Sequence, residues 1–161
     1  MKIRRLLCLA LILAFTVTAL SGCDMLLKAR DVEDIYDDLK ATGKLPKMLV
    51  MEDRYSKEYY ASMVEEYLGV SLPEIESSRI AISEDPKRVD TIILVKSKDK
   101  KAVRELMDRY IAELGKQVKS ASPELYEQVK DAAVGQYKDL TYLVISPEKD
   151  RFIKIITAIK K

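Results

Sequence analysis

Apolar positions recur at helical spacing in five stretches of the chain beyond residue 30, and three other stretches are β-rich. The first helical stretch is residues 31–40, where apolar side chains stand at i, i+3, i+4 and i+7. The second is residues 56–68, in which Ser56 suits an N-cap and Gly69 suits the position after the helix end. Both stretches are predicted to form amphipathic helices.

The β-rich stretches predict a small antiparallel sheet. Residues 79–83 and 90–96 are separated by the turn-forming residues 84–87, which predicts an antiparallel hairpin. Residues 90–96 are apolar on both faces at their centre, so they should form a central strand. The third stretch, residues 140–145, is expected to pair with it in the antiparallel direction. Residues 48–51 fit either an edge strand or an extended connection.

The three remaining helices are predicted in the second half of the chain. The strongest is residues 99–121, where the i, i+3, i+4 rhythm continues over four turns. Ser122, followed by proline, starts another helix that should end near Gly135. The last is expected over residues 147–159. The resulting fold class is α+β, a mainly antiparallel sheet of about three strands packed against helices in the order αα-ββ-αα-β-α.

The first 22 residues have the layout of an export signal. Basic residues stand within residues 2–5, nearly all of residues 6–20 are apolar, and the tetrapeptide Leu-Ser-Gly-Cys occupies residues 20–23. An apolar run of about 15 residues rises only about 22 Å as a helix, which is short of a hydrocarbon core about 30 Å thick. A removable signal is therefore favoured over a permanent membrane span.

The tetrapeptide at residues 20–23 resembles the lipobox of bacterial lipoproteins. This resemblance implies cleavage between Gly22 and Cys23 and attachment of a diacylglyceryl group, with fatty-acid chains such as palmitate, to the sulfur of Cys23. The expected organisation is a signal peptide (1–22), a lipidated tether (23–30) and a single α+β domain (31–161). The expected partner is the bilayer, and the expected location is the outer side of a bacterial cell membrane. The alternative is an uncleaved anchor with an incidental Cys23.

Composition removes several classes of site. The chain has no histidine, no tryptophan and only two cysteines, so a zinc centre, a histidine-based triad and a disulfide framework are not expected. The five carboxylates of residues 31–38 lack the glycine and the ligand spacing of an EF-hand, which favours a solvated helix face over a metal site. No cofactor is expected. Without residues 1–22 the chain holds 25 basic and 26 acidic side chains, so a nucleic-acid partner is not expected either.

Charge is distributed unevenly along the mature chain. Residues 23–78 carry 7 basic and 13 acidic side chains, whereas residues 79–161 carry 18 basic and 13 acidic ones. The basic half could meet an anionic wall polymer or an acidic envelope protein. Alternatively, the two halves attract each other inside the fold.

Tyrosines cluster around the second predicted helix. Tyr55, Tyr59, Tyr60 and Tyr67 all fall in this region. Their rings offer contact area at low entropic cost, so they form a candidate interaction surface for sugars or partner proteins. The alternative is that they pack at the domain edge.

No catalytic constellation can be assembled from the sequence, so the chain is not expected to be an enzyme. The favoured hypothesis is a lipid-anchored, non-enzymatic binding module of the cell envelope that contacts another envelope protein or a polymer. The alternative is a receptor for a small molecule or peptide, which requires a concave pocket with converging polar groups. A further alternative is a carboxylate-based hydrolase that acts on wall glycans.

Several stretches of the chain resemble a known family. Residues 66–70, 89–95, 122–127 and 140–146, together with the charged helix that follows Lys98, are similar to the bacterial lipoprotein family described as domain of unknown function 4358. Ser122 departs from the aromatic residue that this family tends to place before the proline. Because the family has no assigned activity, the resemblance implies no functional residues.

Overall fold

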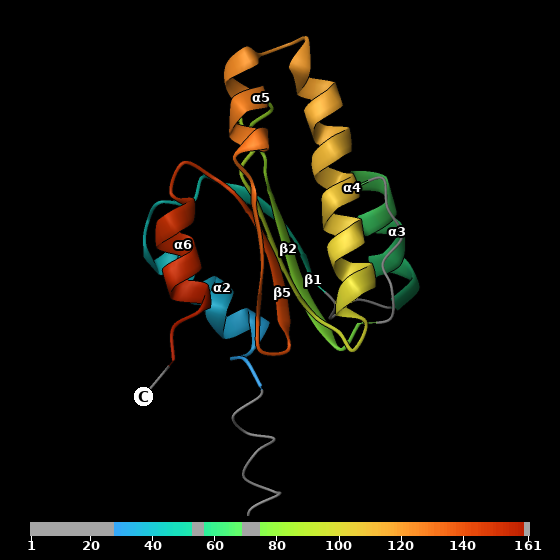
Figure 1. Ribbon diagram of the computed structural model, residues 1–161, viewed down its shortest axis with the longest axis vertical. Helices are drawn as coiled ribbons and strands as arrows, with labels where there is room; N and C mark the ends of the chain where they lie inside the picture. The colour runs from blue at the N-terminus through green and yellow to red at the C-terminus, as the bar shows by residue number, and fades with distance from the viewer. Residues whose placement is uncertain (1–27, 53–56, 69–74, 160–161) are drawn as a thin grey trace, which may run out of the picture.

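The computed structural model of the chain describes residues 28–52, 57–68 and 75–159. These residues form an antiparallel five-stranded sheet, in the strand order β1-β2-β3-β5-β4, that is flanked by helices (Figure 1). The α+β class is therefore confirmed. The elements are α2 (Val32–Ala41), β1 (Met48–Glu52), α3 (Lys57–Leu68), β2 (Ser77–Ser83), β3 (Thr91–Lys96), α4 (Lys100–Lys119), α5 (Pro123–Lys130), β4 (Ala133–Tyr137), β5 (Leu140–Ile145) and α6 (Lys149–Ile156).

The prediction of about three strands was wrong, because the sheet has two more. Residues 48–52 form the edge strand β1, which pairs with β2 in the antiparallel direction. Residues 133–137 form the other edge strand, β4, where a helix ending near Gly135 was predicted. The helix in fact ends at Lys130. The element order is accordingly α-β-α-ββ-αα-ββ-α.

The strand β4 was missed because its hairpin lacks the usual sequence signature. The turn between β4 and β5 places Lys138 at a φ of +56°, a backbone conformation that glycine or asparagine normally adopts. Gly135 is required by packing, since a Cβ at this position would lie 2.2 Å from the hydroxyl oxygen of Tyr142. This glycine therefore marks a strand under an aromatic ring and not a helix end.

The centre of the sheet matches the prediction. β3 pairs antiparallel with β2 on one side and with β5 on the other, and all six of its residues are buried. The predicted hairpin and the predicted pairing of residues 90–96 with 140–145 are both confirmed. β3 is buried on both faces because helices cover both sides of the sheet (Figure 1).

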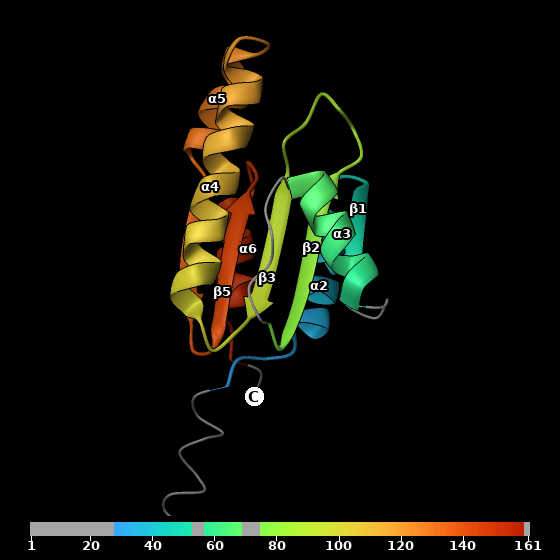
Figure 2. The ribbon, with the colours of Figure 1, turned by 90° about the vertical axis from the view of Figure 1, so that its right-hand side faces the viewer.

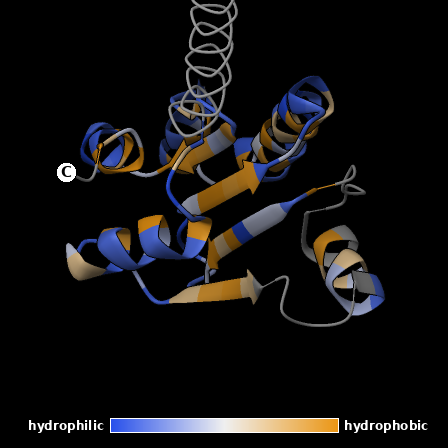
Figure 3. Ribbon diagram, turned by 90° about the horizontal axis from the view of Figure 1, so that it is seen from below, coloured by the Kyte–Doolittle hydropathy of each residue, from blue (hydrophilic) through white to orange (hydrophobic). Residues whose placement is uncertain are grey.

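Alternate side chains of β3 enter two separate hydrophobic cores. Ile93 and Val95 join the core beneath α3, α4 and α5, whereas Ile92 and Leu94 join the core beneath α2 and α6. Seen along the sheet, the apolar strands lie between helices whose outer surfaces are largely polar (Figure 3). Within the part of the chain that the structure describes, no helix is both long and apolar enough to cross a bilayer.

Local hydrogen bonds fix the residues at which the helices in the second half of the chain begin. A side-chain oxygen of Asp99 accepts from the N–H of Ala102 at 2.9 Å, and the hydroxyl of Ser122 accepts from the N–H of Leu125 at 3.3 Å. The cap at Ser122 was predicted, whereas for Asp99 the sequence predicted only that a helix starts near this residue. The last helix starts later than predicted, at Lys149, because Ser146 forms a turn before it by accepting from the N–H of Glu148 at 3.2 Å.

The two ends of β3 lie in different surroundings. Its first end adjoins the β2–β3 loop, and α4 and α5 extend beyond the sheet at this end (Figure 2). Its last end adjoins residues 28–31, where the described chain begins, and the described chain also ends on this side, after α6 (Figures 1 and 2).

Candidate functional site

The structure does not bring the predicted site residues together. Gly22, Cys23 and Tyr55 lie outside the described residues, so lipid attachment, signal cleavage and the role of Tyr55 stay predictions. Tyr67 belongs to α3, but its side chain is outside the description as well.

The two remaining tyrosines of the candidate surface have different environments. Tyr59 is 53% exposed, which is compatible with an interaction surface. Tyr60 is buried, and its hydroxyl is hydrogen-bonded to that of Ser78 on β2. The assignment of Tyr60 to an exposed surface is therefore corrected, because its ring is part of the core between α3 and the sheet.

The acidic residues near the start of the domain are engaged with basic side chains. Glu33 lies 3.3 Å from Arg79, and Asp31 lies 3.5 Å from Lys96, so the acidic half of the sequence contacts the basic half within the fold. A hydrogen bond from Lys40 lowers the pKa of Asp37. Among the described residues, no group of three or more acidic or cysteine side chains could hold a metal ion.

A pocket of about 510 Å³ opens at the Asp90 end of the sheet. Its lining comes from three segments that are distant in sequence: residues 86–90 of the β2–β3 loop, residues 121–128 of the α4–α5 turn and α5, and Pro147 after β5. Loops that converge at one end of a rigid sheet are common positions for binding residues. Its volume falls in the range of sites that hold small ligands.

Asp90 is the most unusual residue of this pocket because its carboxylate is 2% exposed. One of its oxygens, Oδ2, accepts from Nε of Arg88 at 2.8 Å. Its other oxygen, Oδ1, is buried without a hydrogen-bond partner among the described residues. A buried acceptor left in this state costs about 1–3 kcal/mol, and more when the group is charged.

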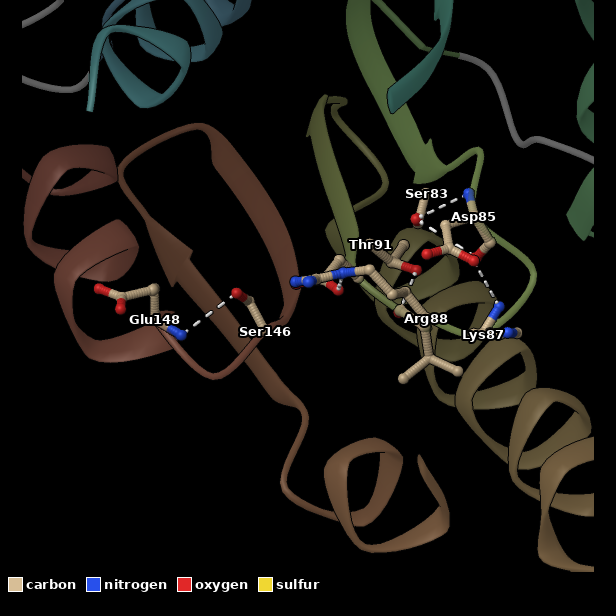
Figure 4. A network of polar contacts seen from close by, with 9 residues as sticks. Ser83, Asp85, Lys87, Arg88, Thr91, Ser146 and Glu148 are labelled. Carbon is tan, nitrogen blue, oxygen red and sulfur yellow. Dashed lines mark hydrogen bonds and ion pairs between the residues drawn. The ribbon is translucent and has the colours of Figure 1, made fainter. Parts of the chain in front are cut away.

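The β2–β3 loop holds Arg88 and Asp90 in place through its own hydrogen bonds. The backbone oxygen of Asp85 accepts from the N–H of Arg88 at 3.0 Å, and a side-chain oxygen of Asp85 accepts from the N–H of Lys87 at 2.9 Å. The N–H of Ser83 donates to the backbone oxygen of Asp90 at 2.9 Å. Figure 4 shows Ser83, Asp85, Lys87 and Arg88 on one side and Ser146 with Glu148, from the β5–α6 connection, on the other.

The short helix α5 supplies the opposite wall. The side-chain nitrogen Nε2 of Gln128 is buried and has no hydrogen-bond partner within the described chain. Gln128 and Asp90 both line this pocket, while the unpartnered atoms Nε2 and Oδ1 are themselves closed off from solvent. The hydrogen bond to Asp90 also raises the pKa of Arg88, which keeps this guanidinium charged.

The other end of β3 carries a second buried charge, Lys96, and its surroundings are complete. Its ammonium nitrogen donates to the backbone oxygen of Ala29 at 3.0 Å and lies 4.0 Å from a carboxylate oxygen of Asp139. Asp139 also accepts from the N–H of Ala29. Residue 29 of the expected tether is thereby fixed to the end of the sheet.

Sequence reasoning missed the pocket residues. Asp90 was treated as the first residue of a buried strand, although a carboxylate directly before an apolar strand and after a Pro-Lys-Arg turn is an unusual combination that could have drawn notice. Gln128 carries no comparable signal, since glutamine is common on helix surfaces and its position under the β2–β3 loop depends on tertiary packing.

Comparison with known proteins places the chain in a family. The family model described as "Domain of unknown function (DUF4358)" matches residues 50–146, which is more than half of the chain. The chain therefore belongs to this family, and the matched segment includes most of the pocket lining. No curated protein and no solved structure is significantly similar to the chain.

Proposed function

We propose that this member of the DUF4358 family is a lipid-anchored binding protein of the bacterial cell envelope, and that it receives its ligand in the pocket beside Asp90. The single observation that carries the binding role is the cavity of about 510 Å³, whose lining includes Asp90, a buried carboxylate with one oxygen that has no hydrogen-bond partner among the described residues. Proteins retain such groups mainly where a ligand or a function requires them, because they reduce stability.

The anchoring part of the proposal rests on the sequence of residues 1–23 and is supported by the contacts of residue 29. Cys23 and Ala29 are six residues apart, which allows a separation of at most about 22 Å when the chain is fully extended. Because Lys96 and Asp139 hold residue 29, a lipid on Cys23 would keep this end of the sheet near the membrane.

The pocket would then face away from the membrane. Asp90 and Lys96 are separated by six steps along β3, which corresponds to about 20 Å. The tether contacts Lys96 at one end of the strand, and the pocket is at the other. Such a protein would present its binding site to molecules outside the bilayer.

A receptor is favoured over the two other hypotheses. The large hydrophobic side chains that are exposed in the described part of the chain are Tyr59 and Ile159, which belong to different elements and offer little support for a broad protein-docking patch. Of the two carboxylates in the pocket lining, that of Asp90 is buried and already accepts from Nε of Arg88, so it is poorly placed to act as the acid or base of a carboxylate-based hydrolase. Binding is therefore proposed in place of hydrolysis.

Membrane fractionation and mass spectrometry of the mature N-terminus test the anchor. We expect the chain to start at a lipid-modified Cys23 and to stay in the membrane fraction. The Cys23→Ala variant should accumulate as unprocessed precursor or as soluble protein, whereas Cys8→Ala, which changes the other cysteine, should behave like the wild type. An unmodified Cys23 with residues 1–22 still attached would contradict this part.

Native mass spectrometry of the mature chain, released from membranes in detergent, tests the pocket. A small-molecule adduct should be present in the wild type and in Ala112→Trp, and absent from Ala121→Trp. Both substitutions place a large ring at an exposed alanine, Ala112 within α4 and Ala121 just after it, but only Ala121 lines the pocket. Absence of an adduct in the wild type, or an adduct that persists in Ala121→Trp, would contradict the proposed site.

A further inference from the structure

We infer that the groove between α4 and α5 binds an acidic segment of another protein, which inserts one apolar side chain beside Gly115 and sets its carboxylates against the lysines of the groove. This surface lies outside the Asp90 pocket, so the inference goes beyond the proposed function. It is drawn from the apolar lining of the groove, from a glycine within α4 and from the charges that surround both.

The two helices lie side by side (Figure 1), and residues of both line a groove of about 260 Å³. The apolar side chains that border it and reach solvent are Ile111 and Tyr126, which are half-buried, and Ala112, which is exposed. Pockets that hold small ligands measure about 300–1,000 Å³, so this one suits a single inserted side chain better. Side chains inserted in this way are the usual anchors of protein–protein contacts.

Gly115 lines the same groove, inside the helix α4, at a position where alanine would fit. A Cβ there would lie 3.7 Å from Cε2 of Tyr126 and 3.8 Å from Cγ1 of Val129, which are ordinary van der Waals contacts. Glycine inside a helix lowers stability relative to alanine. The packing of the described chain requires Gly135 but not Gly115, and a side chain inserted from outside explains why position 115 is left without a Cβ.

The charged residues that line the groove, within the described chain, are all lysines: Lys116 and Lys119 from α4 and Lys130 from α5. The ammonium nitrogens of Lys119 and Lys130 lie 5.7 Å and 5.6 Å from the centroid of the Tyr126 ring. These cation–π contacts bring one cation from each helix to the same ring and hold both at the groove before a partner arrives.

Two glutamates beside the groove compensate part of this charge. A carboxylate oxygen of Glu113 lies 2.7 Å from Nζ of Lys116, and one of Glu127 lies 3.0 Å from Nζ of Lys130. Each pair joins residues three positions apart on a helix surface, with more than half of every side chain exposed, and such pairs are weak. Lys119 takes part in neither pair. The carboxylates of an acidic partner can therefore compete for all three lysines.

The apolar lining selects a protein segment over a polyanion. A polymer of phosphate groups would satisfy the lysines and leave the space beside Gly115 empty. A segment with an apolar side chain between acidic ones meets both features of the groove. Such a contact is narrow, in keeping with the small number of large hydrophobic side chains that the described chain exposes.

Three short capped peptides test the inference. The first has leucine at its centre, two glutamates on each side and serines at both ends; the second replaces the leucine with alanine, and the third replaces the glutamates with glutamines. Dissociation constants for the mature chain in detergent are measured by microscale thermophoresis. The first peptide should bind about fivefold more tightly than the second and about tenfold more tightly than the third, because only the first offers both the anchor and the charges.

Gly115→Ala separates binding from stability. The new Cβ occupies the space of the inserted side chain, so the affinities for the leucine and alanine peptides should come within twofold of each other. The same change should raise the midpoint of thermal unfolding by about 3 °C, because alanine suits a helix better than glycine. A lower midpoint would show that the fold itself requires the glycine, and an undiminished preference for leucine would place the anchor elsewhere. Either result overturns the inference.

Matched lysine substitutions locate the charge contacts. Lys119→Gln should weaken the first peptide about fivefold and change binding of the glutamine peptide by less than twofold. The controls are Lys101→Gln, at the other end of α4, and Lys87→Gln, in the lining of the Asp90 pocket, and both should preserve all three affinities. An equal loss in Lys87→Gln would place the peptide in the Asp90 pocket and overturn the inference.

The remaining outcomes assign the groove to other occupants. If inorganic polyphosphate binds as tightly as the first peptide, the occupant is a polyanion. If the chain forms a dimer that Gly115→Ala dissociates, the occupant is a second copy. Either finding, or no binding of the first peptide, would show that an acidic protein segment is the wrong partner, while the tests of the Asp90 pocket and of the anchor would be unaffected.

Discussion

The central strand β3 has a buried charge at each end, and the two charges differ in how many partners surround them. Lys96, at the last position, has the backbone oxygen of Ala29 at 3.0 Å and two carboxylates within 4.0 Å. Asp90, just before the first position, has Arg88 on one oxygen and no partner among the described residues on the other. Lys96 is thus surrounded by several partners from distant parts of the chain, whereas the carboxylate of Asp90 is paired through one oxygen with a residue two positions away.

This difference separates a structural charge from a binding charge. A buried ion is tolerated when its partners are supplied by the fold, and Lys96 meets this condition while it fixes the start of the domain. Asp90 meets it only in part, since Arg88 pairs with one of its oxygens and the other has no partner among the described residues, and it lines a cavity. The comparison therefore predicts that substitutions at the Lys96 end reduce stability, whereas substitutions at the Asp90 end affect binding.

The largest effect is expected for Lys96→Ala. This change removes the ammonium that holds Ala29 and also removes a buried aliphatic stem, so the free energy of unfolding should fall by about 3 kcal/mol. Urea unfolding followed by circular dichroism measures this loss. Lys98→Ala, two residues away and exposed, should change stability by no more than about 0.5 kcal/mol. Equal effects of the two substitutions would remove the contrast between the ends.

A smaller effect is expected for Asp139→Ala, which removes the acceptor of the Ala29 N–H. The free energy of unfolding should fall by about 1.5 kcal/mol. Trypsin should also cut faster after Lys28 and Arg30, because this segment is no longer held to the sheet. Asp131→Ala, which removes an exposed carboxylate paired with Lys149, serves as the control and should leave the cleavage rate unchanged. Unaltered proteolysis in Asp139→Ala would show that the segment is held by other contacts.

Alkaline pH should reveal a third, smaller effect near the Asp90 end. Burial raises the pKa of Tyr110, whose hydroxyl is 3.2 Å from that of Thr91, the residue after Asp90. Because the folded protein favours the neutral phenol, its stabilising contribution is complete below pH 10 and is lost as the pH rises through the raised pKa. Stability measured between pH 8 and pH 11 should therefore decline less in Tyr110→Phe. Burial of Tyr36 acts in the same direction, so part of the decline should persist.

The sequence predicted the parts of the molecule whose structure depends on residues that are close together in the chain. The cap at Ser122, the start of α4 near residue 99 and the apolar run of β3 were all identified, since each depends on neighbours in the chain. Of the two edge strands, β1 was left open between a strand and an extended connection, and β4 was missed. Edge strands bury less apolar surface, and the turn at Lys138 lacks the residues that normally announce a hairpin.

The candidate site could not be predicted to the same extent, because it is made by tertiary contacts. Asp90 and Gln128 come from elements that are joined only when α5 packs over the end of the sheet. The charge pattern of the sequence also left two interpretations open, contact with an external partner or attraction between the two halves of the chain. The ion pairs of Glu33 with Arg79 and of Asp31 with Lys96 show that the acidic and basic halves contact each other inside the fold.

The free energy of unfolding of Asp90→Asn tests the central claim most directly. An asparagine can still accept from Arg88 with its carbonyl oxygen. If Asp90 is kept for binding, the free energy of unfolding of this variant should be higher than that of the wild type, or lower by no more than about 1 kcal/mol. A loss of about 3 kcal/mol or more, comparable to that of Lys96→Ala, would mean that Asp90 is as structural as Lys96. The contrast between the two ends of β3 would then be contradicted.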